Sequence, residues 1–264
     1  MNTARVTLYG IDDDAVTVNE TRTRVADTIA GGRRGKVVTL NTTGLMLAER
    51  QPFFRRFVAE ADLVVADGQP LVWLSPLFGR RLPARVAGID LIEQLAEQAA
   101  RSRHSIYLLG AEPETVATAA AELQARHPGL QIAGSHHGFL GDGASDVACA
   151  IGASGAAILL VGMGSPRQEE FIDTYWDQLG VNIAIGVGGS FEVLANRLVR
   201  APRWVQSVGL EWAFRMLQEP RRLTRRYADT FVWLIRRTAS LTTGLNRSGQ
   251  LPATTPAPPR SLKK

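Results

Sequence analysis

Asp67 is a carboxylate at the tip of a predicted strand, because the apolar, β-branched run Leu63–Ala66 leads directly into Asp67-Gly68. Open α/β sheets bind ligands beyond the carboxyl ends of their strands. Arg85 and Gly88 follow, and Asp90 stands where a helix cap is expected. An acid, a cation and a flexible glycine at one sheet edge suit a site for a polar, anionic substrate. The alternative is an ordinary Asp-Gly turn with Asp90 as a simple cap.

A second candidate site lies at a glycine-rich strand exit, where Gly162 and Gly164 precede a predicted helix. We expect Ser165 to be the N-cap, Pro166 the first helical residue and Gln168 the third. Backbone N–H groups beside glycines at a helix N-terminus form an anion site suited to a diphosphate. The alternative is an ordinary capping box, in which Gln168 satisfies only backbone donors.

The acidic run 12–14 contains three consecutive aspartates that could hold a divalent cation. It follows a short predicted strand and has no supporting ligand pattern nearby. We therefore interpret it as a helix-capping turn and expect no metal site.

These residues need a scaffold, and the chain alternates β-rich runs with amphipathic helical stretches. The expected strands are 37–41, 63–66, 105–110, 130–134, 157–162 and 181–188. The expected helices are 12–30, 44–60, 90–101, 113–126, 142–153 and 166–178. This rhythm predicts an α/β protein with a Rossmann-like, mostly parallel sheet flanked by helices.

Length and composition limit the protein class. The 264 residues, 45% hydrophobic and 21% charged, suffice for one sizeable core with an appendage. A single cysteine, Cys149, excludes an intramolecular disulfide framework and suits a reducing compartment. We find no secretory signal pattern and no apolar run of about 18 residues, so we expect a cytoplasmic protein that does not span a membrane.

The C-terminal end differs from the rest in charge. Residues 1–199 carry 17 basic and 22 acidic groups, whereas residues 200–237 carry 9 and 3. Two helices are expected there, one over about 200–218 and one over about 221–240. In the second, Leu223, Tyr227, Phe231 and Leu234 recur at helical spacing among arginines. Such a helix lies in a bilayer interface, with Phe231 and Trp233 among the headgroups. The alternative, that its apolar face packs on the core while arginines hold a diphosphate, stays open.

We therefore divide the chain into a core, 1–199, a basic helical appendage, 200–240, and a tail, 241–264. The end of the tail is Pro-rich and lacks hydrophobic periodicity, so we expect the tail to be disordered.

An ordered series of motifs resembles the WecG/TagA/CpsF glycosyltransferases, glycosyltransferase family 26, over about residues 5–240. The motifs are VVTLN (37–41), ADLVVADG (61–68), RVAGIDL (85–91), IYLLGAEP (106–113), HPGLQIAGSHHGF (127–139), ILLVGMGSPRQEEFI (158–172), IGVGGSFEVLA (185–195) and RAPRWVQSVGLEWAFRMLQEPRR (200–222). The resemblance implies an inverting, UDP-sugar-dependent hexosyltransferase with a polyprenyl-diphosphate-linked sugar as acceptor. Such enzymes build surface polysaccharides or teichoic-acid linkage units. Their Rossmann-like core carries an appendage that reaches the membrane and helps complete the active site.

The resemblance also implies roles for individual residues. Asp67 matches the proposed general base. Thr39, Asn41, Arg85 and Gln168 match pocket residues, and Arg215, Arg222 and Arg225 match appendage arginines that stabilise the UDP leaving group. With Gly88, Gly162 and Gly164 these form the expected substrate-binding set. This chain departs from the usual pattern at Thr42-Thr43, Glu192 and Asn196, which leaves the donor sugar open.

Two other classes fit less well. A nicotinamide-dependent oxidoreductase needs a glycine fingerprint followed by an acid, and the loop 185–191 lacks the G-x-G-x-x-G spacing. A nucleic-acid-binding protein could use the basic end but has no need of Asp67, Arg85 and Gln168. We thus expect a peripheral enzyme on the inner face of the cell membrane that uses no metal or other cofactor. Its expected partners are a UDP-sugar, a polyprenyl-linked acceptor and an anionic membrane surface, without nucleic acid. A homo-oligomer is an open alternative.

Overall fold

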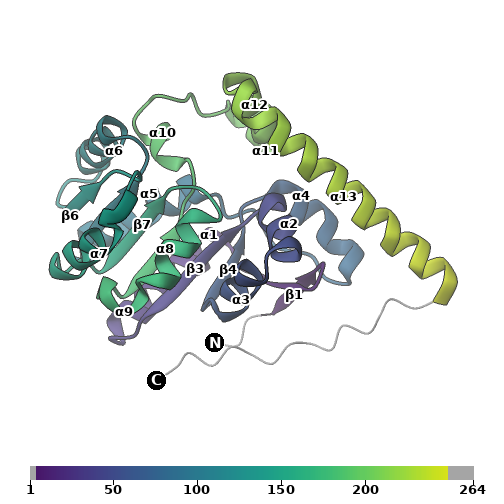
Figure 1. Cartoon of the computed structure of the whole chain (residues 1–264), viewed down its shortest axis with the longest axis horizontal. Helices are drawn as coiled ribbons and strands as arrows, with labels where there is room; N and C mark the ends of the chain where they lie inside the picture. Colours follow the sequence, from purple (N-terminus) through teal and green to yellow (C-terminus); the bar gives the residue numbers. More distant parts are fainter. Residues whose placement is uncertain (1–3, 249–264) are drawn as a thin grey trace.

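A six-stranded parallel sheet organises the chain, in the order β4-β3-β8-β7-β5-β6 (Figure 1). The computed structural model describes residues 4–248, apart from the side chains of Arg222 and of residues 241–248. The sheet strands are β3 (Gly35–Leu40), β4 (Leu63–Ala66), β5 (Ser105–Gly110), β6 (Gln131–His136), β7 (Ile158–Gly162) and β8 (Ile183–Gly186). An antiparallel hairpin, β1 (Arg5–Leu8) and β2 (Ile11–Asp14), precedes them. The predicted Rossmann-like α/β class is confirmed.

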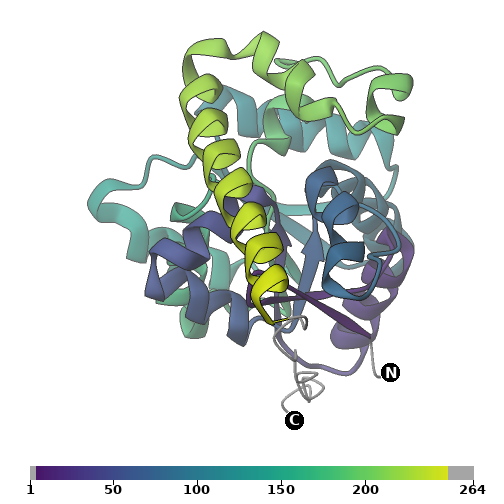
Figure 2. The same ribbon diagram turned by 90° about the vertical axis from the view of Figure 1, so that its right-hand side faces the viewer.

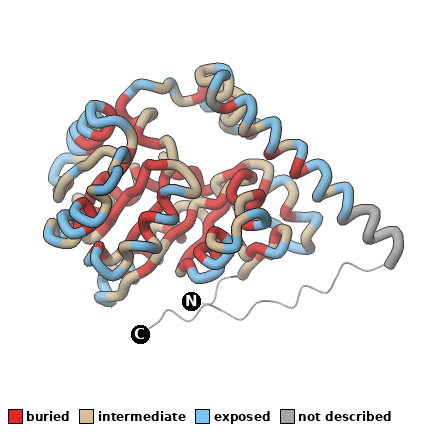
Figure 3. The backbone as a smooth tube through the Cα atoms, viewed as in Figure 1, coloured by how far each residue is buried: buried red, intermediate tan, exposed pale blue. Residues whose placement is uncertain are grey.

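Helices cover both faces of the sheet, which explains why its strands are apolar on both sides. One face packs against α1 (Val18–Ala30), α5 (Gly88–Ser102), α6 (Pro113–Arg126) and α10 (Ser190–Leu194). The other packs against α2 (Thr42–Arg50), α3 (Pro52–Glu60), α7 (Ala144–Ala153), α8 (Arg167–Thr174) and α9 (Trp176–Leu179). Successive residues of one strand, such as Val37 and Val38, enter opposite layers. Figure 3 shows the resulting buried centre along the strands.

The acidic run 12–14 lies in strand β2, so the prediction of a helix-capping turn is wrong. Asp14 accepts a hydrogen bond from the backbone N–H of Val64, 2.9 Å away, and thereby ties the hairpin to the edge strand β4. Helix α1 begins later, behind the N-cap Thr17, which forms a capping box with Glu20. Local sequence could not reveal this pairing, because the donor to Asp14 lies 50 residues away.

Two predicted continuous helices are each divided in two. The stretch 44–60 breaks at Gln51, because Pro52 has no N–H to continue α2 and instead starts α3. The stretch 200–218 forms α11 (Arg203–Ser207) and α12 (Glu211–Gln218). Gly209, with φ +74° in the left-handed region, ends the first of them.

The last helix, α13 (Pro220–Ser248), docks along one side of the core (Figures 1 and 2). Trp233 is only 7% exposed and lies 5.5 Å from the ring of Tyr9 between ring centroids. The hydroxyl groups of Tyr9 and Thr238 are 2.6 Å apart. The expectation that Trp233 lies among lipid headgroups is therefore wrong, because the apolar face that carries it is already covered by the hairpin.

The appendage nevertheless exposes other apolar side chains, including Leu217, Val232 and Ile235. Helix α13 continues beyond residue 240, the expected end of the appendage, as far as Ser248. Residues 249–264 of the predicted tail lie outside the described residues. Among residues 4–248, no helix is both long enough and apolar enough to cross a membrane.

Candidate functional site

A cavity of about 860 Å³ lies at the carboxyl edge of the sheet, closed on one side by α12 and α13. Residues that follow each of the six sheet strands contribute to its wall, as expected for an open α/β sheet. The predicted site residues that line the cavity are Thr39, Asn41, Asp67, Arg85, Gly88, Gly162, Gly164, Gln168 and Arg215. Arg225 lies outside this lining and is exposed. The side chain of Arg222 is outside the described part of the structure.

Asp67 lies at the floor of the cavity, where β4 leaves the sheet. Its backbone N–H donates to the carbonyl of Leu40 at 2.7 Å, so the neighbouring strand holds the turn in place. Burial raises the pKa of Asp67 to about 7. This rise is opposed by the positive charge on Arg85, by a hydrogen bond from the Gly88 N–H and by the positive charge on Arg215. The carboxylate of Glu211 adds to the rise. The group can therefore exchange a proton near neutral pH.

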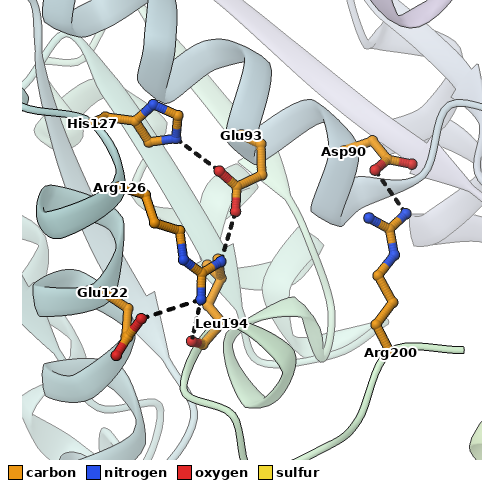
Figure 4. Close-up of polar contacts among 7 residues, drawn as sticks. All are labelled: Asp90, Glu93, Glu122, Arg126, His127, Leu194 and Arg200. Carbon is orange, nitrogen blue, oxygen red and sulfur yellow. Dashed lines mark hydrogen bonds and ion pairs between the residues drawn. The ribbon is translucent and has the colours of Figure 1, made fainter. Parts of the chain in front are cut away.

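A chain of opposite charges joins the core to the appendage above Asp67. Arg85 forms an ion pair with Glu211, at the start of α12. Arg200 pairs with Asp90 at 2.7 Å and lies 3.7 Å from Glu211. Figure 4 shows the pair of Asp90 and Arg200. Asp90 is not the predicted helix cap, since α5 begins behind Ala87, and its carboxylate instead holds an arginine of the appendage.

Three predicted pocket residues already have protein partners. The Thr39 hydroxyl donates to the carbonyl of Gly186 at 2.7 Å, and Asn41 caps α2 by accepting from the N–H of Gly44 at 3.1 Å. The carbonyl oxygen of the Gln168 side chain accepts from the N–H of Gly188 at 3.1 Å. These side chains thus shape the cavity wall by fixing its loops, in addition to facing the cavity.

Ser165 does not cap α8, whose N-cap is Pro166. The Ser165 hydroxyl instead donates to Glu169 at 2.8 Å, and the Gln168 amide nitrogen donates to the same oxygen at 2.8 Å. The expectation that Ser165 is the N-cap is therefore wrong, and the alternative of a Ser165–Gln168 capping box does not form. Burial raises the pKa of Glu169, which is only 3% exposed. The cluster holds the Gln168 amide in the orientation that engages the glycine loop after β8.

The two glycines of this strand exit have different functions. A Cβ atom on Gly162 would lie 2.7 Å from the ring of Phe191 and 3.0 Å from the carbonyl oxygen of Gly188. Gly162 therefore permits close packing behind the cavity wall. Gly164 has open space around it but adopts φ +75°, which favours glycine.

Helix α10, behind the glycine loop, is held by a polar network between α5 and α6 (Figure 4). Arg126 pairs with Glu93 at 2.9 Å and donates to the carbonyl of Leu194 at 3.4 Å. His127 lies 2.7 Å from the other oxygen of Glu93. This network connects helices on one face of the sheet with the loop that lines the cavity.

The appendage brings its own polar groups to the cavity. Arg215 donates to the carbonyl of Gly189 at 3.1 Å and lies 3.6 Å from Glu219. Arg226 and Tyr227 also line the cavity. The helix thus directs Arg226, rather than its neighbour Arg225, into the cavity, because successive helical residues point about 100° apart.

Sequence reasoning missed Glu211, Arg226 and Tyr227 as cavity residues. Arg226 and Tyr227 follow Leu223 at spacings of three and four, which places all three on one helix face. The periodicity therefore contained a signal for them, whereas nothing local indicated that Glu211 meets Arg85. Among the described residues, no group of three or more His, Cys, Asp or Glu side chains is arranged to hold a metal ion.

A comparison with protein families agrees with this arrangement. The model described as the Glycosyl transferase WecG/TagA/CpsF family matches residues 6–245, which include the sheet, the cavity and most of the appendage.

We predict that Asp67→Asn stabilises the fold at alkaline pH. The pKa of Asp67 is higher in the folded protein than its ordinary value of 3.8, so its burial destabilises the fold increasingly as the pH rises from about 4 to about 7. Removing the charge should raise the free energy of unfolding by about 1–3 kcal/mol at pH 8 and hardly at pH 4. Denaturant unfolding at both pH values measures the difference.

Asp90→Asn is the matched control, because that carboxylate is 44% exposed and paired with Arg200. It should give no gain at pH 8. An equal gain from Asp67→Asn at both pH values would show that packing of the amide, rather than loss of the charge, is responsible.

Proposed function

This chain belongs to the WecG/TagA/CpsF family of glycosyltransferases, which serve surface-polymer synthesis, and from that premise we propose that it is an inverting hexosyltransferase. Its proposed donor is a UDP-sugar of the N-acetylmannosamine, N-acetylmannosaminuronic acid or glucose type, and its acceptor is a polyprenyl-diphosphate-linked sugar. The observation that carries the proposal is the Asp67 carboxylate, whose pKa is raised to about 7, in a cavity lined by arginines of the core and the appendage.

In the proposed reaction, Asp67 takes the proton from the acceptor hydroxyl. The hydroxyl oxygen attacks the anomeric carbon from the side opposite UDP. The new glycosidic bond forms as the bond to the diphosphate oxygen breaks, so the configuration inverts and UDP leaves with the electron pair. A positioned general base of this kind contributes about 10²–10⁴ to the rate.

The leaving diphosphate needs positive charge, and the appendage supplies it. Arg215 and Arg226 line the cavity, and Arg222 has the same role through the family resemblance. Fixed guanidinium groups bind phosphate oxygens in a bidentate way and stabilise the charge that develops on them. We therefore propose that transfer requires no divalent metal. The rate in excess EDTA should equal the rate in buffer, and a loss restored by Mg²⁺ or Mn²⁺ would contradict the proposal.

We place the enzyme at the inner, cytoplasmic face of the cell membrane, because a polyprenyl-linked acceptor stays in the bilayer. Support comes from the outer side of α13, where exposed Arg221, Arg225 and Arg236 accompany exposed Val232 and Ile235. Arginines attract anionic lipid, while the apolar side chains enter the headgroup region. Arg225 thus suits a lipid phosphate better than the UDP diphosphate.

Asp67→Asn tests the proposed base. Turnover with a UDP-sugar and a short-chain polyprenyl-diphosphate sugar should fall by about 10²–10⁴, because proton transfer is lost. Binding of UDP, measured by calorimetry, should hardly change. In the wild-type enzyme, kcat/KM should rise with pH up to about 7 and then level off, since the base must be deprotonated. Unchanged turnover in the variant would exclude Asp67 as the base.

Arg215→Ala and Arg225→Ala form a matched pair within the appendage. Arg215 lines the cavity, so its loss should lower kcat by about 10²–10³ through weaker stabilisation of the leaving group. Arg225 is exposed outside the cavity, and its variant should transfer sugar to a water-soluble acceptor near the wild-type rate. Equal losses of kcat in both variants would contradict the proposal that Arg215 contacts the substrate and Arg225 does not.

A further inference from the structure

A patch of exposed apolar side chains spans the junction of the core and the appendage. Two of its members belong to the core, Trp73 in α4 (Gln69–Leu74) and Leu77 in the short helix η1 (Ser75–Phe78), and they are 53% and 54% exposed. The other two, Trp204 and Val208, lie in and just after α11 and are 70% and 50% exposed. We call these four side chains the junction patch. Two exposed tryptophans in one patch indicate an interaction surface.

A close backbone contact joins the two halves of the patch. At Gly209, directly after Val208, a Cβ atom would lie 2.3 Å from the side chain of Gln69 and 2.5 Å from the ring of Trp73. The absence of a side chain therefore lets the turn between α11 and α12 lie directly on α4. Trp73 of the core therefore lies directly against the turn that follows Val208 of the appendage.

The junction patch lies beside residues that line the cavity. Gln69 and Gly209 both line the cavity, and Trp73 follows Gln69 by one turn of α4. Figure 2 looks onto this side of the molecule, with α13 running down it in yellow-green, α4 and η1 in blue beside it, and α11 and α12 in green above. A surface that holds the patch would also hold the cavity mouth.

The two chain segments that carry the patch contain basic residues and no acidic ones. The chain between Asp67 and Asp90 contains no acidic residue, and its Arg80 and Arg81 are exposed and form no ion pair with any described residue. The stretch 198–210 is also free of acids and carries an exposed arginine, Arg203. Tryptophan at the headgroup level with arginines beside it fits an anionic bilayer surface.

We infer that the junction patch, with Arg80 and Arg81, is a second membrane contact, supplied in part by the catalytic core, which seats the cavity mouth on an anionic bilayer. This inference rests on the proposed function, which places the acceptor in the membrane. It adds a core segment to a contact that the family resemblance assigns to the appendage alone. A diphosphate at the bilayer surface would then face the side of the cavity that Gln69 and Gly209 line.

The test compares full-length variants on vesicles of phosphatidylcholine with and without phosphatidylglycerol. In one variant Leu77→Ser is combined with Arg80→Gln and Arg81→Gln, and none of these three residues lines the cavity. Binding to the anionic vesicles should weaken about 10–30-fold, and transfer to an acceptor embedded in them should fall in parallel. Transfer to a water-soluble acceptor should keep the wild-type rate. Trp73→Ser, made separately, should weaken vesicle binding as well.

The matched control removes two other exposed arginines of the core, Arg101 and Arg103, at the end of α5 that leads into β5. This control should bind vesicles like the wild type. Equal vesicle binding by the wild type and by the Leu77, Arg80 and Arg81 variant would overturn the inference while leaving the proposed transfer intact. Dissociation of a wild-type dimer in this variant, with unchanged vesicle binding, would also overturn it and assign the patch to a second copy of the chain.

If the wild type binds neither type of vesicle yet transfers sugar to the soluble acceptor, the membrane contact fails but the transferase activity stands. If it transfers no sugar to any acceptor, the proposed function itself fails.

Discussion

The balance of charge around Asp67 is the constraint on which the site depends. A carboxylate at the floor of a cavity loses hydration, and that loss favours its protonated form. The core opposes this with Arg85 and the Gly88 N–H, and the appendage opposes it with Arg215. Since the appendage also brings Glu211, which has the reverse effect, the docked position of α12 contributes to the proton affinity of Asp67. Docking of the appendage therefore changes the electrostatic environment in which Asp67 exchanges its proton.

The sheet provides the rigidity that such a balance requires. Asp67 follows a strand that is buried on both faces, and the loops around it are fixed by bonds from Thr39 and Gln168 to backbone groups. A shift of these loops would change the distance between the carboxylate and its neighbouring charges. Thr39 and Gln168, which the family resemblance assigns to substrate binding, thus also hold the cavity wall in place.

The last helix, α13, presents different residues to the cavity, to the core and to solvent. Tyr227 and Arg226 face the cavity, Trp233 packs on the hairpin, and Arg225 faces solvent. An α-helix turns by about 100° per residue, so neighbours in sequence can serve different surfaces. The same 29-residue helix can in this way close the cavity, cover the core and leave a stripe of arginines and apolar side chains exposed.

The sequence by itself determined the α/β class, the strand that ends at Asp67 and the helix Pro113–Arg126, because hydrophobic periodicity and helix-start chemistry are local properties. The family resemblance added Thr39, Asn41 and Arg215 to the residues that line the cavity. Only the tertiary structure decided the strand at 12–14, the burial of Trp233 and the pairing of Arg85 with Glu211. Each of these depends on partners far away in sequence, and the energy of such a contact arises only when the fold brings the partners together.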